Sequence, residues 1–119
     1  MDPNLQASFR AMADSVPVLI WLSDADGAFT FVNQRWLEFT GRTLDQELGY
    51  GWADNVHPDD RAQCTADHCA AIKRREPFEL ELRLRRADGA WRWVLARAVP
   101  LAGGFVGSAI DLTERRKAE

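Results

Sequence analysis

Phe78-Glu-Leu-Glu-Leu-Arg-Leu-Arg85 alternates apolar with charged side chains at every step. A period of two is typical of a strand that buries one face and exposes the other. The turn Asp88-Gly89 follows, and apolar segments at 91–99 and 105–110 flank the loop Gly103-Gly104. Because Asp-Gly pairs favour tight hairpin turns, the last third of the chain is predicted to form three antiparallel strands.

A leading helix is predicted at the start of the chain. Leu5, Phe9 and Met12 recur at helical spacing and form one apolar stripe. The residue before a proline disfavours helical backbone, so this helix, over 4–13, is expected to end ahead of Pro17.

A β-hairpin and a block of short helices are predicted next. Segments 18–23 and 29–32 flank the turn Asp24-Ala-Asp-Gly27, in which glycine supplies the left-handed backbone that such turns need. Asn33 then caps a short helix that Gly41 stops.

The second half of the helical block carries two more helix-start signals. Thr43 with Gln46 three residues later resembles a capping box. His57-Pro-Asp-Asp60 places proline and acids in the first turn of a longer helix, predicted over 59–75. The inner side of this helix is predicted to carry Ala62, Ala66, Cys69 and Ile72 or Ala70. Five antiparallel strands with helices packed on one face make the expected fold class α+β.

The end of the chain predicts a helix that leaves the domain. Asp111-Leu-Thr-Glu-Arg-Arg-Lys-Ala-Glu119 contains no glycine or proline, with Thr113 as a plausible N-cap and Glu114 in the first turn. A last strand that runs directly into a charged helix is typical of an input module, so we expect the chain to be part of a longer protein.

Composition limits the class of protein. The chain has 119 residues, enough for one domain, and its net charge of −3 disfavours a nucleic-acid partner. The basic groups between 73 and 97 are better explained by charge pairing across strands. The longest apolar run, 16–22, is too short for direct membrane insertion. Two cysteines make no disulfide framework, and we expect a cytoplasmic protein.

Five segments in this order and spacing resemble the PAS sensory domain, in the branch that ends with the PAC motif. They are Asp24-Ala-Asp-Gly-Ala-Phe-Thr-Phe-Val-Asn33, Trp36-Leu-Glu-Phe-Thr-Gly41, Trp52 through His57-Pro-Asp-Asp-Arg61, 78–93 with its Asp88-Gly89 turn, and Gly107 through Asp111-Leu-Thr-Glu-Arg115. The resemblance implies a curved five-stranded sheet whose concave face, covered by short helices, can hold a small molecule. It also implies a homodimer formed through the leading helix and the outer sheet face.

The resemblance further divides the chain into a cap helix (1–16), a PAS core (17–111) and the start of a signalling helix (112–119). An output domain is expected in cis beyond that helix, commonly a histidine kinase or a cyclic-dinucleotide enzyme. The residues expected to line the pocket are Trp21, Asn33, Leu37, Phe39, Trp52, Val56, Cys69, Ile72, Leu82 and Trp93. Those expected to serve dimerisation or signalling are Leu5, Phe9, Met12, Asp111, Thr113 and Arg115.

Three residues on the longer helix raise the question of a cofactor. Cys64 and His68 lie four apart and share a helical face, as metal or haem ligands do, whereas Cys69 is interpreted as a small packing residue. His57 beside two acids is interpreted as a helix start rather than a metal site. The flavin-photosensing subfamily uses a cysteine in an Asn-Cys-Arg motif, which is absent here. The cofactor is left unknown, with none expected to bind tightly.

The tryptophans leave one question of orientation open. Five are present, and they fill the core or form a cage around a ligand. Trp91 and Trp93 share one strand face, but Val94, Ala96 and Ala98 on the other face are also apolar. The sequence therefore does not decide which face points inward.

The favoured function is a regulatory PAS module of a bacterial-type signalling protein, above all a sensor histidine kinase. It dimerises, binds a small ligand or none, and controls a downstream output domain. The first alternative is a haem or flavin sensor. The second is a stand-alone α+β enzyme that uses His57 and its neighbouring acids, although we find no catalytic motif and expect no catalysis in this chain.

Overall fold

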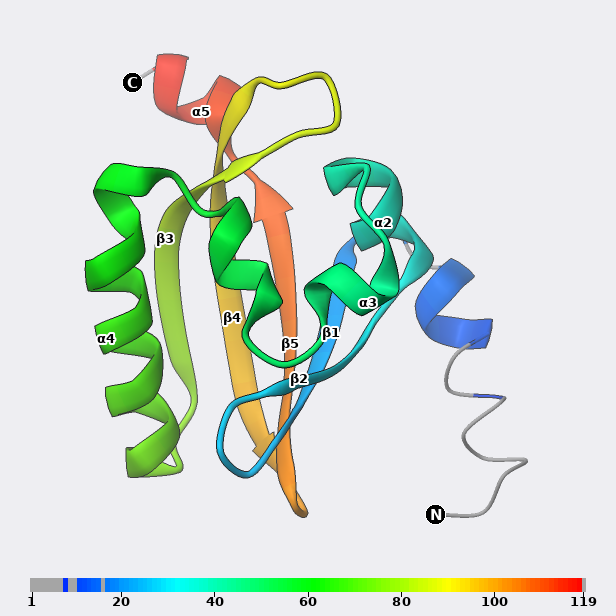
Figure 1. The fold of residues 1–119 in the computed structure, drawn as a ribbon, viewed down its shortest axis with the longest axis vertical. Coiled ribbons are helices and arrows are strands. Elements are labelled where there is room, and N and C mark those ends of the chain that lie inside the picture. The colour runs from blue at the N-terminus through cyan, green and yellow to red at the C-terminus, as the bar shows by residue number, and fades with distance from the viewer. Residues whose placement is uncertain (1–7, 9–10, 16, 119) are drawn as a thin grey trace.

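All five predicted strands are present and form one antiparallel sheet in the order β2-β1-β5-β4-β3 (Figure 1). This computed structural model describes residues 8, 11–15 and 17–118. The strands are β1 (Leu19–Asp24), β2 (Phe29–Val32), β3 (Phe78–Arg85), β4 (Trp91–Leu101) and β5 (Gly104–Asp111). The last strand, β5, lies in the middle of the sheet, so the chain leaves the sheet from its centre.

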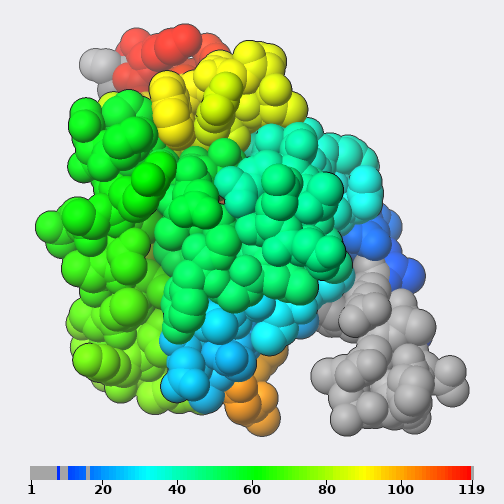
Figure 2. Space-filling model, viewed as in Figure 1, coloured from blue at the N-terminus to red at the C-terminus, as the bar shows by residue number. Residues whose placement is uncertain are grey.

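Helices cover one face of this sheet, as the α+β prediction requires (Figure 1). They are α2 (Gln34–Thr40), α3 (Leu44–Glu47), the 3-10 helix η1 (Gly51–Asn55) and α4 (Pro58–Arg74). Figure 2 shows these helices closing over that face, with α4 running along β3 at the edge of the sheet. The exit helix α5 (Thr113–Ala118) begins directly after β5.

Side-chain caps start the helices where the sequence predicted them. The Asn33 side chain accepts a hydrogen bond from the Trp36 amide, and Thr43 and Gln46 form a reciprocal capping box. His57 Nδ1 accepts a hydrogen bond from the Asp59 amide at 3.1 Å, so its role is to cap α4. These caps depend only on local chemistry, which explains why they were predictable.

The buried face of α4 differs from the prediction. Ala62, Ala66, Cys69 and Ala70 are exposed, whereas the buried residues are Cys64, His68, Ala71 and Ile72. Of the predicted inner residues only Ile72 is buried. Ala62, Ala66 and Ala70 lie on one stripe of the helix, but alanine buries little apolar area, so the contacts of the other residues with the sheet determine the rotation of the helix.

A close approach of Trp21 to β5 fixes the centre of the core. A Cβ atom at Gly107 would collide with the indole of Trp21, so only glycine permits this contact. Trp21 in turn stacks on Phe29, with ring centroids 4.7 Å apart. The core therefore sits between the sheet and the helices.

The leading helix is only partly described. Residues 11–15 are helical, which extends the element beyond the predicted end at residue 13, and Met12 is 63% exposed. Leu5 and Phe9 lie outside the described residues. Within the part that is described, the helix lies beside the junction of β2 and α2, where the Ala13 carbonyl accepts a hydrogen bond from Asn33 (Figure 1).

Candidate functional site

An apolar cavity lies between the sheet and the covering helices. Trp21, Trp52 and Leu82, which were predicted to line a pocket, lie on its wall. Sequence reasoning missed several further lining residues, among them Phe29, Trp36, Cys64, His68, Phe78 and Leu84. The cavity has a volume of about 30 Å³. One to two water molecules fill such a space, and a larger ligand requires the rings to move apart.

Stacked rings account for the small volume. Phe29 lies between Trp21 and Trp52, with centroid distances of 4.7 and 5.3 Å. The indole Nε1 of Trp52 is buried and finds no acceptor among the described residues. The cavity wall therefore combines an apolar surface with one unsatisfied hydrogen-bond donor.

Four other predicted lining residues pack around the cavity rather than on its wall. Val56 and Ile72 are buried in the core, and Leu37 and Phe39 are half-buried against it. Asn33 is fully buried and hydrogen-bonds the carbonyls of Ala13 and Val18, so it holds the leading segment to the hairpin.

Two predicted lining residues were wrong. Cys69 is exposed, because α4 turns Cys64 inward instead. Trp93 pairs with Arg83 across β3 and β4, next to the pair of Leu82 and Val94 that faces the cavity. Since neighbouring residues on a strand face opposite sides, Trp93 lies on the outer face, which answers the question of orientation that its sequence left open.

His68 is a buried ionisable group on the wall of the cavity. Its Nε2 lies 3.1 Å from the Gly27 carbonyl oxygen, and its ring packs edge-on against Trp52 at 5.0 Å. Burial lowers the pKa of His68, although the hydrogen bond to Gly27 opposes this shift. The spacing of Cys64 and His68 on one helical face was the signal that could have identified both as inward-facing.

We expect this burial to make stability depend on pH. In the unfolded chain His68 binds a proton near its ordinary pKa of about 6.5, while the folded protein keeps the ring neutral to lower pH. The contribution is therefore full above about pH 6.5 and is lost as the pH falls, by at most about 1.4 kcal/mol per pH unit. Urea unfolding between about pH 7.5 and 5.5 should show a flatter pH dependence for His68→Phe than for the wild type.

The control for that measurement is Cys64→Ala, which alters another buried residue of the cavity wall and leaves both histidines in place. Its pH dependence should match the wild type. Burial raises the pKa of the neighbouring Cys64 thiol to about 11, so this group does not titrate in the same range. Equal slopes for wild type and His68→Phe would contradict the expected role of His68.

The junction of β5 and α5 is tied to β4 by charge pairs and hydrogen bonds. Arg92 bridges Asp111 at 2.7 Å and Glu114 at 3.2 Å. Burial alone would raise the pKa of Asp111, but hydrogen bonds from Arg92 and Thr113 outweigh burial and lower it. Thr113 is not the N-cap: the Asp111 carboxylate accepts its amide hydrogen bond, and its hydroxyl oxygen accepts the Trp93 amide hydrogen bond at 2.7 Å.

A second set of contacts fastens α5 to the outer face of the sheet. The Arg116 guanidinium lies 3.9 Å from the centroid of the Trp93 ring and pairs with Glu81 at 3.0 Å. Arg83 lies over the same ring at 5.1 Å and forms a bidentate pair with Asp60 on α4. Contacts thus run without interruption from α4 through β3 and β4 to the exit helix. We call this set, Asp60, Arg83, Trp93, Arg116 and Glu81, the exit-helix contacts.

Comparison with known proteins assigns the family. A family model described as "PAS fold" matches residues 29–106. The chain belongs to the PAS family. Its five-stranded antiparallel sheet and covering helices match solved PAS and LOV structures. The LOV protein of Rhodobacter sphaeroides aligns with a TM-score of 0.75 at 26% identity, over 92% of this chain and 68% of that chain.

Two curated relatives extend the comparison. An uncharacterized protein, y4lL, of Sinorhizobium fredii is 44% identical over 96% of this PAS domain and 14% of its own length. The peroxide stress-activated histidine kinase mak1 of Schizosaccharomyces pombe is 27% identical over 77% of the domain and 6% of its own length. The domain thus spans a small part of these relatives, which include a signalling kinase.

The described part of the PAS domain offers no preformed metal centre. No three His, Cys, Asp or Glu side chains within it converge on one point. Asp60 is instead occupied by Arg83, whose hydrogen bonds lower the pKa of this carboxyl. No helix among the described residues is long and apolar enough to cross a membrane.

Proposed function

We propose that this PAS domain is the sensory module of a cytoplasmic sensor histidine kinase and that it passes its state through α5 to an output domain beyond residue 119. The exit-helix contacts carry this proposal. They join α4, which lines the cavity, to the helix that leaves the domain. A rearrangement of α4 would move Asp60 and the Arg83 guanidinium that it binds. Because Arg83 lies over the Trp93 ring, the contact of Arg116 with the same ring would then change as well. In this proposal the sensing core is formed by residues 17–111, and residues 112–119 begin the helix that relays the signal to the output domain.

The cavity is the proposed site of the signal. Its small volume and apolar wall suit a ligand of few atoms that accepts a hydrogen bond from Trp52. Haem and flavin fit poorly, because the three stacked rings would have to separate and His68 would have to leave the Gly27 carbonyl to reach a metal. We therefore propose that no large cofactor is bound tightly.

Dimerisation through the outer sheet face and the leading helix completes the proposal. Val99 and Ile110 are apolar and nearly half exposed on neighbouring strands of that face, and Met12 is more exposed still. Exposed apolar area of this kind usually marks an interface. Native mass spectrometry tests it, since a single chain of 13.4 kDa at all concentrations would contradict a dimer.

The relay is tested in the longer protein that contains this chain. Arg116→Gln removes the cation over Trp93 and should change the basal autophosphorylation rate by about fivefold or more. Arg35→Gln is the matched control, because Arg35 is exposed on α2 and pairs only with Glu38 among the described residues. Equal rates in the two variants would contradict the relay, and so would a gene that ends directly after residue 119.

A further inference from the structure

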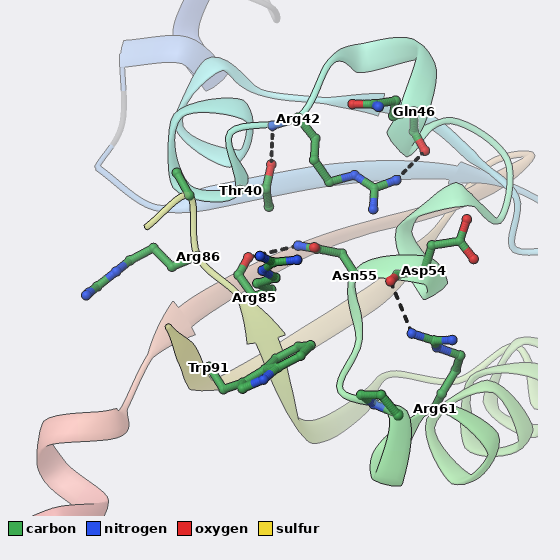
Figure 3. A pocket seen from close by; sticks show the side chains of 11 residues that line it. Thr40, Arg42, Gln46, Asp54, Asn55, Arg61, Arg85, Arg86 and Trp91 are labelled. Carbon is green, nitrogen blue, oxygen red and sulfur yellow. Dashed lines mark hydrogen bonds between the residues drawn. The ribbon is translucent and has the colours of Figure 1, made fainter. Parts of the chain in front are cut away.

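An arginine-lined cleft opens at one end of the molecule, separate from the apolar cavity (Figure 3). It lies where the β3–β4 turn, the start of α4 and the α2–α3 connection meet, and its volume is about 670 Å³. None of its lining residues lines the apolar cavity. A volume of this size is typical of sites for small organic molecules.

The arginines of the cleft differ in how they are paired. Arg42 pairs with the buried carboxylate of Glu47 at 2.7 Å, and Arg86 pairs with Asp88 at 2.8 Å. Figure 3 shows the Arg42 guanidinium hydrogen-bonded to the Gln46 carbonyl oxygen, while the Arg86 guanidinium points away from the other lining side chains. Arg61 and Arg85 have no carboxylate partner among the described residues. The cleft therefore holds two uncompensated cations.

Arg61 is held in place but only partly bonded. Its Nη2 donates hydrogen bonds to the carbonyls of Asp54 and Val56 at 3.2 and 3.1 Å. Its Nε is buried and has no acceptor in the described part of the chain. Asp54 is the one acid that lines the cleft, and Figure 3 shows its carboxylate turned away while its carbonyl oxygen meets Arg61.

Arg85 also lines the cleft. The Asn55 side chain donates a hydrogen bond to its carbonyl oxygen at 2.9 Å, which fixes the backbone. Its guanidinium makes no hydrogen bond or ion pair with any described residue and faces solvent. This group is free to bind an anion without breaking an existing contact.

Trp91 adds a flat apolar surface beside these cations. Its ring is 39% exposed and packs against His57 at a centroid distance of 4.6 Å, which limits its movement. An exposed indole held from behind is a good stacking surface for a planar ring. Guanidinium groups bind phosphate oxygens through charge-assisted, often bidentate hydrogen bonds.

We propose that the cleft binds a small organic phosphate, with the phosphate at Arg61 and Arg85 and a planar ring on Trp91. The cleft is much larger than a phosphate ion alone, so the ring accounts for the remaining space. The next residue, Arg92, faces the opposite side of β4 and bridges Asp111 and Glu114 at the start of α5, so Trp91 is linked to the exit helix through the backbone of β4. The site is independent of the apolar cavity and of any ligand there.

Calorimetry on the intact chain at fixed ionic strength tests the proposal with three probes. Adenosine 5′-monophosphate should bind, inorganic phosphate should bind more weakly, and uncharged adenosine should not bind measurably. Arg85→Gln should weaken nucleotide binding by about tenfold or more, since it removes charged hydrogen bonds. Arg61→Gln should do the same, and Arg85→Gln keeps the test valid if loss of Arg61 impairs folding.

The matched control is Arg74→Gln, which removes the same charge from an exposed position at the opposite end of α4. Its affinity for the nucleotide should equal that of the wild type. Equal weakening in Arg74→Gln and Arg85→Gln would show diffuse charge attraction and overturn the site. Absence of nucleotide binding up to millimolar concentrations, or equal affinity for inorganic phosphate, would overturn it as well.

Discussion

Glu47→Ala is expected to lower the free energy of unfolding by about 3 kcal/mol or more, because it breaks a buried ion pair. The Glu47 side chain is 0% exposed. One oxygen lies 2.7 Å from Arg42 Nε, and the other accepts a hydrogen bond from the Trp36 indole at 3.0 Å. Alanine leaves the buried indole N–H without its acceptor and Arg42 without its counter-charge. Urea unfolding monitored by tryptophan fluorescence measures the loss.

Glu38→Ala is the matched control for this substitution. Glu38 also pairs with an arginine, Arg35, but both side chains are about half exposed and the distance is 3.4 Å. Exposed pairs of this kind contribute about 0–1 kcal/mol. If Glu47→Ala lowered the free energy of unfolding no more than Glu38→Ala does, the contacts of Glu47 would not stabilise the packing of α2 against α3 as we infer.

The elements that the sequence predicted well are those that depend on neighbours along the chain. The alternation in β3 needs only successive residues, and so do the caps at Asn33 and Thr43. The 3-10 helix η1 was missed. Its five residues are too few to show a periodic apolar pattern, and no capping side chain marks its start.

The site was less predictable, because its contacts join distant segments. His68 is buried against Gly27, which lies 41 residues earlier. Both faces of β4 carry apolar residues, so only the guanidinium groups of Arg83 and Arg116 show why Trp93 can face outward. The cleft likewise brings together arginines from three separate segments, and no spacing in the sequence indicates this.

Asn33→Asp is expected to lower the free energy of unfolding by about 3 kcal/mol, because a carboxylate cannot donate the hydrogen bonds that the amide makes. Asn33 Nδ2 donates to the carbonyls of Ala13 at 2.7 Å and Val18 at 2.9 Å. Its Oδ1 accepts hydrogen bonds from the amides of Ile20 and Trp36. The aspartate keeps both accepting bonds but places a buried negative charge against two carbonyl oxygens.

Two comparisons separate the lost donors from a general loss of stability. Asn55→Asp removes a donor to one carbonyl only, that of Arg85, and should cost clearly less than Asn33→Asp. In Asn33→Asp, hydrogen exchange should quicken at residues 11–15 while the amides of Ile20 and Trp36 keep their protection relative to the rest of the core. Only the donating hydrogen bonds join the leading segment to the hairpin, and the accepting bonds survive the substitution. Equally faster hydrogen exchange at all of these amides would therefore show that Asn33 does not specifically hold the leading segment.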